Sequence, residues 1–160
     1  MANVTKNKVL TAAQIGGVPY GNKTVLHSTF QTNTSGVMTD SDKTAAVANG
    51  DVVRIGLLPA GAKLVDALAI ISDAFTASTT ATIGFAYVDG VDDANVPQDA
   101  DYFAASLSTA ATSRTRATNK TVTPVTLPKD AYLTLTVGGA SHASAGRMDV
   151  MVDCVLTGTP

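Results

Sequence analysis

The sequence contains no tryptophan and no glutamate, and each absence narrows the class of protein. All 13 acidic residues are aspartates. Because glutamate favours helices whereas aspartate favours helix caps and turns, this composition argues against a helical protein. Abundant threonine and valine, whose branched side chains favour extended backbone, indicate an all-β fold instead.

The chain has only one cysteine, Cys154, which excludes a framework of internal disulfides and is typical of a reducing compartment. With 160 residues, it is long enough to bury about two-thirds of its surface in one domain without disulfides or metals. The N-terminus lacks the apolar core of a signal peptide, and no apolar run approaches membrane-spanning length. We therefore expect synthesis in the cytoplasm and no membrane partner.

Positive charge and catalytic side chains are also scarce. The formal net charge is −2, and nucleic-acid binding normally requires a basic face, so we expect no nucleic-acid partner. The glycine-rich stretch around His142 lacks the GxSxG spacing of a nucleophile turn. The stretch GGVPYGNKT (residues 16–24) lacks the spacing of a phosphate-binding loop. The sequence therefore predicts no enzyme, no catalytic residue and no cofactor.

An aspartate-rich stretch, DGVDDANVPQDAD (residues 89–101), is the one candidate for binding a cation. Loop carboxylates can bind Ca²⁺, but the spacing of an EF-hand and its terminal glutamate are missing. An aspartate-rich turn followed by a helix cap at Asp99 explains most of the cluster. We predict no metal site, with binding of a cation by this loop left open.

Apolar and polar residues alternate with period two in two segments near the C-terminus, Ala131–Val137 and Arg147–Thr157. This pattern is typical of half-buried antiparallel strands. A turn is predicted at Pro59–Gly61, because proline presets φ and glycine tolerates positive φ. Further strands are predicted at Thr24–Phe30, Asp51–Leu58, Lys63–Ser72, Thr80–Val88 and Lys120–Leu127, of which the last contains Pro124 and is expected at an edge or with a bulge.

One short helix is predicted at Asp99–Ala110, where Asp99 would cap it and Phe103 and Leu107 would meet at i, i+4. Residues 108–118 are predicted to form a polar loop. The expected fold is a single antiparallel β-sandwich over residues 23–160, most naturally a jelly roll, preceded by an extended N-terminal arm over residues 1–22. An immunoglobulin-type sandwich is the alternative, although the tryptophan and cysteine pair typical of it are missing.

Three single residues have structural interpretations. Cys154 alternates with Val152 on an apolar face, which predicts a buried and unreactive thiol. His27 shares a face with Val25 and Thr29, and is predicted to face solvent or an interface. The loop around His142 is interpreted as a hairpin between the last two strands.

The segment DVVRIGLLPAGAKLVDALAIISDAFTASTTATIGFAYVDG (residues 51–90), followed by DADYFAASLSTAA (residues 99–111), resembles structural proteins encoded among the head genes of tailed phages. This resemblance covers about half the chain. It implies a jelly-roll decoration or cement protein that binds the exterior of the capsid as a homo-dimer or homo-trimer. The implied partner is the major capsid protein, and the implied location is the virion.

In this interpretation the polar N-terminal arm reaches over neighbouring subunits, and an arginine pair on the polar loop contacts a partner, since arginine is enriched at interfaces. A carbohydrate-binding or head-fibre module on the virion surface is the alternative, because jelly rolls also serve as lectins. A hydrolase on the same scaffold ranks last. The residues predicted to bind partners are Val4, Val9, Leu10, Ile15, Val18, Tyr20, Arg114 and Arg116.

Overall fold

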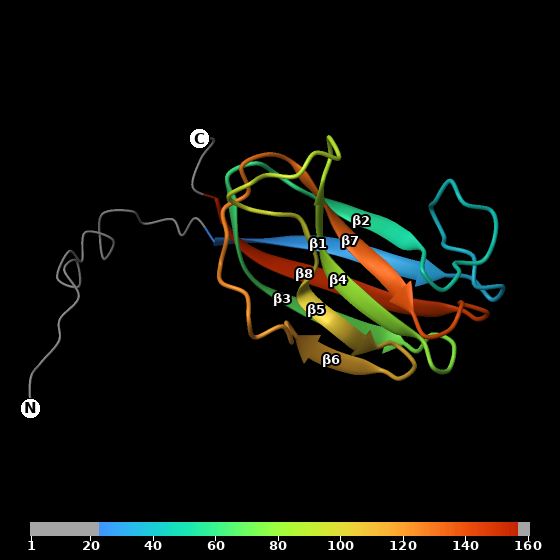
Figure 1. Cartoon of the computed structure of the whole chain (residues 1–160). Helices are drawn as coiled ribbons and strands as arrows, with labels where there is room; N and C mark the ends of the chain where they lie inside the picture. The colour runs from blue at the N-terminus through green and yellow to red at the C-terminus, as the bar shows by residue number, and fades with distance from the viewer. Residues whose placement is uncertain (1–22, 157–160) are drawn as a thin grey trace, which may run out of the picture.

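The computed structural model describes residues 23–156, which form eight β-strands and no helix (Figure 1). Every pairing between strands is antiparallel. One sheet has the strand order β1-β8-β3-β6 and the other has the order β2-β7-β4-β5. The strands are β1 (Lys23–Thr32), β2 (Val52–Leu58), β3 (Ala62–Asp73), β4 (Thr80–Tyr87), β5 (Asp99–Ser108), β6 (Ser113–Arg116), β7 (Ala131–Gly138) and β8 (Gly146–Leu156).

The two sheets enclose one apolar core, as the alternation in the sequence predicts. In β7 the side chains of Leu133 and Leu135 are buried, and in β8 those of Met148 and Val150 are buried. Full burial of a side chain of this size stabilises the fold by about 1.5–3 kcal/mol. The all-β class and the strands predicted at both C-terminal segments are confirmed, up to residue 156.

Strands that follow one another in the sequence mostly lie in opposite sheets. Among the described strands, only β4 and β5 are consecutive and also paired. The turn predicted at Pro59–Gly61 is confirmed, with Gly61 at φ +77°, but it carries the chain from one sheet to the other. The loop between β7 and β8 also crosses between the sheets, so the prediction of a hairpin around His142 is wrong.

The short helix predicted at Asp99–Ala110 is wrong, because this segment forms strand β5. The pairing of β4 with β5 shifts register twice, so that Tyr102, Phe103 and neighbouring Ala104 are all buried. Phe103 and Leu107 both lie on the core side. Residues i and i+4 share a face in a strand as well as in a helix, so this spacing did not distinguish the two. The Asp99 carboxylate accepts a hydrogen bond from the Asp101 backbone N–H (3.0 Å) at the start of the strand, and does not cap a helix.

Two further predictions between β5 and β7 are corrected. The polar loop predicted over residues 108–118 contains strand β6, which pairs with β3 at the edge of its sheet. Lys120–Leu127 does not form a strand and makes one isolated bridge, between Thr126 and Lys63. Since Pro124 has no N–H to donate, a longer ladder through this segment would lose a hydrogen bond.

Candidate interaction surfaces

The two arginines predicted to bind a partner lie on the edge strand β6. Both side chains are exposed, and their backbone positions are paired with Leu68 and Ile70 of β3. Arg116 makes an ion pair with Asp66, whereas no ion pair of Arg114 is found within residues 23–156. Arg114 is therefore the one of the two that is available to a carboxylate on another molecule.

The other six residues predicted to contact a partner all precede residue 23, so they and the expected arm lie outside the described residues. The chain enters the described domain at Lys23, the first residue of β1. The Lys23 Nζ lies 2.8 Å from an Asp153 carboxylate oxygen on the neighbouring strand β8.

A charged cluster occupies the outer face of β1 and β8. The Asp149 carboxylate accepts hydrogen bonds from Arg147 Nε (3.0 Å) and from Thr29 Oγ1 (2.7 Å), and His27 Nε2 lies 2.9 Å from it. The Arg147 guanidinium, followed by the Thr29 and His27 contacts, lowers the pKa of Asp149 well below its usual range, although partial burial opposes this. The exposed side chain of His27 confirms its predicted place on the surface.

The outer face of the second sheet has little charge. Val52 and Leu57 are more than half exposed, at 62% and 54%, although both are apolar. The Arg54 guanidinium lies 4.6 Å from the centroid of the Tyr132 ring, in a cation–π contact. Exposed apolar side chains on a sheet face are a common feature of protein contact surfaces.

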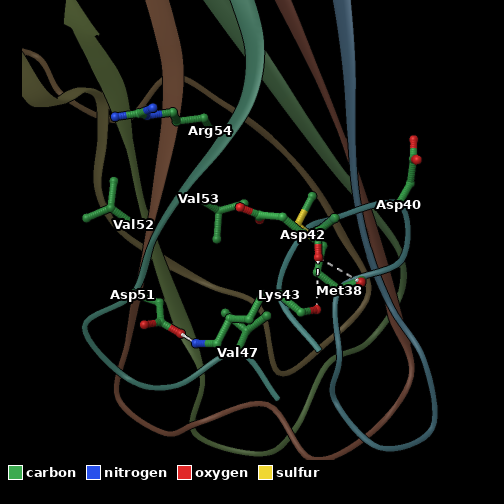
Figure 2. A pocket seen from close by; sticks show the side chains of 10 residues that line it. Met38, Asp40, Asp42, Lys43, Val47, Asp51, Val52, Val53 and Arg54 are labelled. Carbon is green, nitrogen blue, oxygen red and sulfur yellow. Dashed lines mark hydrogen bonds and ion pairs between the residues drawn. The ribbon is translucent and has the colours of Figure 1, made fainter. Parts of the chain in front are cut away.

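A pocket of about 500 Å³ lies between the start of β2 and the long loop formed by residues 33–51 (Figure 2). Lys43 and Asp51 form an ion pair within it, and the Asp51 carboxylate also accepts the Ala48 backbone N–H (2.6 Å). These contacts lower the pKa of Asp51, with the Lys43 hydrogen bond as the largest cause. Lys43 and Asp51 are thus engaged in holding the loop in place.

His142 lies in the β7–β8 loop at the same end of the sandwich and is buried. Its ring meets the rings of Phe30 and Phe75 at centroid distances of 5.5 and 4.8 Å, with its plane steeply inclined to both. Within residues 23–156, His142 Nδ1 has no hydrogen-bond partner, and burial lowers the pKa of His142. This environment favours the neutral imidazole and gives His142 a place in the core.

The aspartate-rich loop uses its carboxylates to form turns. Asp92 accepts the backbone N–H of Gln98 (2.7 Å), and Asp93 accepts those of Asn95 (2.9 Å) and Val96 (3.0 Å). Within residues 23–156, no group of three or more acidic, histidine or cysteine side chains is arranged to hold a metal ion. The interpretation of this stretch as an aspartate-rich turn is confirmed, while its helix cap is not.

Cys154 is fully buried, as predicted, and burial raises the pKa of its thiol. Among residues 23–156, no helix is long and apolar enough to cross a bilayer. The sequence patterns missed the two exposed apolar side chains Val52 and Leu57. The signal for them was present, since both are apolar residues of a strand that the alternation predicted.

Three solved capsids contain chains that are similar in structure to this one. A chain of the capsid of Ralstonia phage GP4 matches with a TM-score of 0.58 and 18% sequence identity, over 85% of this chain and 86% of that chain. A chain of the Cyanophage Pam1 capsid asymmetric unit matches with a TM-score of 0.54 and 16% sequence identity, over 88% of this chain and 89% of that chain. A chain of the acidic stable capsid of Helicobacter pylori bacteriophage KHP30 matches with a TM-score of 0.51 and 15% sequence identity, over 85% of this chain and 93% of that chain.

No protein-family model matches the sequence, and neither does any curated protein. At sequence identities this low, the similarity to the three capsid chains shows a shared fold. It extends over most of the chain in each case, and all three similar chains belong to phage capsids.

Proposed function

We propose that this protein is a jelly-roll structural protein of a phage virion, bound to the outer surface of the capsid as a decoration or cement protein. The observation that carries the proposal is the similarity in fold to chains of three phage capsids. The strand orders β1-β8-β3-β6 and β2-β7-β4-β5 support the jelly roll, since eight antiparallel strands in two sheets is its architecture.

In this proposal the domain over residues 23–160 bridges subunits of the major capsid protein and associates with itself as a dimer or trimer. Arg114 and the exposed apolar side chains Val52 and Leu57 lie on the described surface, where they are available to such partners. Arginine and apolar side chains are common at protein interfaces.

The N-terminal residues 1–22 act in this proposal as an arm that becomes ordered when it crosses a neighbouring subunit. Ordering about 20 residues costs on the order of 20–40 kcal/mol of backbone entropy, so the arm must bury apolar side chains or add main-chain hydrogen bonds. The apolar anchors available for this are Val4, Val9, Leu10, Ile15, Val18 and Tyr20.

The carbohydrate-binding alternative has less support. Stacking on a sugar requires an exposed aromatic ring, but Tyr87 and Tyr102 are buried. The ring of Tyr132 is already covered on one side by Arg54.

The proposal is tested by incubating the purified protein with undecorated phage heads and imaging the particles by electron cryomicroscopy. We expect extra density at ordered positions on the outer surface. A variant that lacks residues 1–20 should still unfold cooperatively, as a folded domain does, but fail to decorate the heads. Strand β1 begins at Lys23, so the deletion removes none of the strands within residues 23–156.

Two results separate the parts of the proposal. Full decoration by the truncated variant would rule out the arm as the anchor and leave the domain as the binding unit. No density with the full chain, on heads that bind another decoration protein, would contradict the capsid role itself. Replacing Arg114 with alanine should weaken decoration more than replacing Arg116, which is held by Asp66.

A further inference from the structure

A groove with a cavity volume of about 310 Å³ lies beside the start of β5. One wall is the loop segment 95–99 and the other is the segment 121–125, with Phe85 and Tyr102 between them. The partly buried side chains of Val96, Val122 and Val125 give both walls of the groove apolar surface, beside polar side chains such as Gln98 and Thr121. We call it the β5 groove.

Both walls of the β5 groove are held by hydrogen bonds from buried tyrosines. Tyr102 Oη donates to the Thr123 carbonyl oxygen (2.8 Å) and accepts the Val125 backbone N–H (3.3 Å). Tyr87 Oη donates to the Val96 carbonyl oxygen on the opposite wall (2.5 Å). The groove is therefore formed before anything binds in it, which lowers the cost of binding.

Negative charge without a cationic partner lies at one end of the β5 groove. Asp99 lines the groove and Asp101 is its neighbour on the strand. Burial, followed by the adjacent Asp101, raises the pKa of Asp99. Within residues 23–156, neither carboxylate forms an ion pair. Lys120, which precedes the wall 121–125, is exposed and does not neutralise them through an ion pair within these residues. A cation placed here would relieve the repulsion between the two carboxylates.

The N-terminal segment of this chain has the complementary chemistry. Residues 1–22 contain Lys6 and Lys8 and no carboxylate, which leaves a formal charge of −4 on the rest of the chain. Val9 and Leu10 follow directly. The segment Lys6–Leu10 thus combines two cations with two apolar side chains, as the β5 groove combines two carboxylates with apolar walls.

The β5 groove also lies within reach of that segment. Lys23, the first residue of β1, pairs with Val155 of β8, and Val155 also pairs with Lys63 of β3. Lys63 in turn forms a bridge to Thr126, which lies beside the groove. Three strand spacings amount to about 14 Å. The 15 residue-to-residue steps from Lys8 to Lys23 span up to about 50 Å when extended. Figure 1 shows β1 and β5 beginning at the same end of the sandwich.

We propose that the segment Lys6–Leu10 binds in the β5 groove of its own chain, with the lysines at Asp99 and Asp101 and the apolar side chains between the valine walls. The inference rests on the proposed function only in treating residues 1–22 as an arm. In the free protein, this contact holds the arm against the domain at a high effective concentration. On a capsid, the arm would leave the groove for a neighbouring subunit.

The test uses the full chain in solution, without capsids, so that its outcome is independent of the capsid role. A spin label is attached to a cysteine introduced by Ala2→Cys, since Cys154 is buried. Amide NMR signals of the non-proline residues within 95–99 and 121–125 should lose more than half of their intensity. In the double variant Asp99→Asn with Asp101→Asn, this loss of intensity should be at least threefold smaller. About 1 M salt should reduce the loss in the full chain to the same extent, because it screens charges within roughly 3 Å.

The matched control is the double variant Asp40→Asn with Asp73→Asn, which removes the same charge from exposed positions away from the groove. It should leave the signal loss unchanged. Equal losses in both double variants would overturn the proposal, as would the absence of any loss in the full chain. A last experiment dilutes the protein that carries both the spin label and the isotope label with copies that carry neither. If the loss of intensity then disappears, the groove is occupied by the N-terminal segment of a second copy, and the proposal that a chain binds its own segment is wrong.

Discussion

Replacing Gly36 with alanine should loosen the contact between the loop of residues 33–51 and the β7–β8 loop. Gly36 has φ +74°, in the left-handed region, where alanine costs about 1–2 kcal/mol. A Cβ at this position would also lie 2.2 Å from the carbonyl oxygen of His142. Because that neighbour is backbone, it cannot rotate away, so one of the loops must move.

The size of the effect follows from the hydrogen bonds around Gly36. The gap must widen by more than 1 Å to reach the 3.4 Å of ordinary contact. The bonds at risk run from Val47 N to Gly36 O (2.9 Å) and from His142 N to Val47 O (2.8 Å). At about 0.5–1.5 kcal/mol each, their loss and the cost of φ together destabilise the fold by about 2–5 kcal/mol. In a chain of this size, that lowers Tm by about 4–20 °C.

The measurement is thermal unfolding by calorimetry, with Gly90→Ala as the control. Gly90 has nearly the same φ, +70°, but a Cβ there would meet nothing within 4 Å. Only the cost of φ applies, so its Tm should fall by about 2–8 °C. If both variants lost the same number of degrees, the close approach of the two loops would contribute nothing to stability and the reasoning from Gly36 would be refuted.

Three further predictions concern single side chains. Burial lowers the pKa of His142 in the folded state. The stability that neutral His142 contributes is therefore present above about pH 6.5 and declines below it, by at most about 1.4 kcal/mol per pH unit. His142→Phe should flatten the dependence of the urea midpoint on pH between about pH 7 and 5. Equal slopes for His142→Phe and the parent would show that burial of neutral His142 does not cause this dependence. The lowered pKa of Asp149 predicts a second loss of stability as pH falls below about 4. Asp149→Asn should reduce this loss at low pH, at the expense of stability at pH 7. If the variant lost as much stability below pH 4 as the parent, the Arg147 contact would not contribute to the pH dependence. The buried Cys154 thiol should react with a disulfide reagent at the rate of unfolding, and rapid labelling of the native protein would contradict its position in the core.

The all-β class and most strands could be predicted from the sequence because burial on one face of a strand leaves a period-two pattern. The partners of the strands could not. With consecutive strands mostly in opposite sheets, the pairing of β1 with β8 joins the two ends of the domain. Such a pairing depends on the whole fold and leaves no local signal between neighbouring residues.

The helix predicted at Asp99–Ala110 shows how local patterns mislead at irregular strands. Tyr102, Phe103 and Ala104 are buried in succession because β5 changes register against β4. Burial of three successive residues matches neither the period-two alternation of a regular strand nor the i, i+3, i+4 stripe of an amphipathic helix, so the local pattern did not identify this strand. Propensity favoured neither state strongly, and the contact with β4 decided the outcome.

The candidate surfaces were predicted only where they depend on single residues. Exposure of His27 and burial of Cys154 followed from their neighbours along the strand. The β5 groove did not, because its walls come from two segments that are separated by β5 and β6 in the sequence. Its hydrogen bonds run from tyrosine side chains to backbone atoms, and the sequence does not specify which backbone atoms will be near.

The edges of the two sheets differ in how strongly they resist pairing with another chain. Strand β6 is short and carries two arginines, and β2 shifts register between Arg54 and Gly56. The edge of β5 is covered where the Thr118 backbone N–H donates to the Phe103 carbonyl oxygen (2.8 Å). Short strands, charges, bulges and covering segments all hinder the addition of a further strand. Strand β1, in contrast, runs ten residues without a register shift and continues directly from residues 1–22. A further strand would therefore meet the least resistance at the edge of β1, whose first residue, Lys23, directly follows residues 1–22 in the sequence.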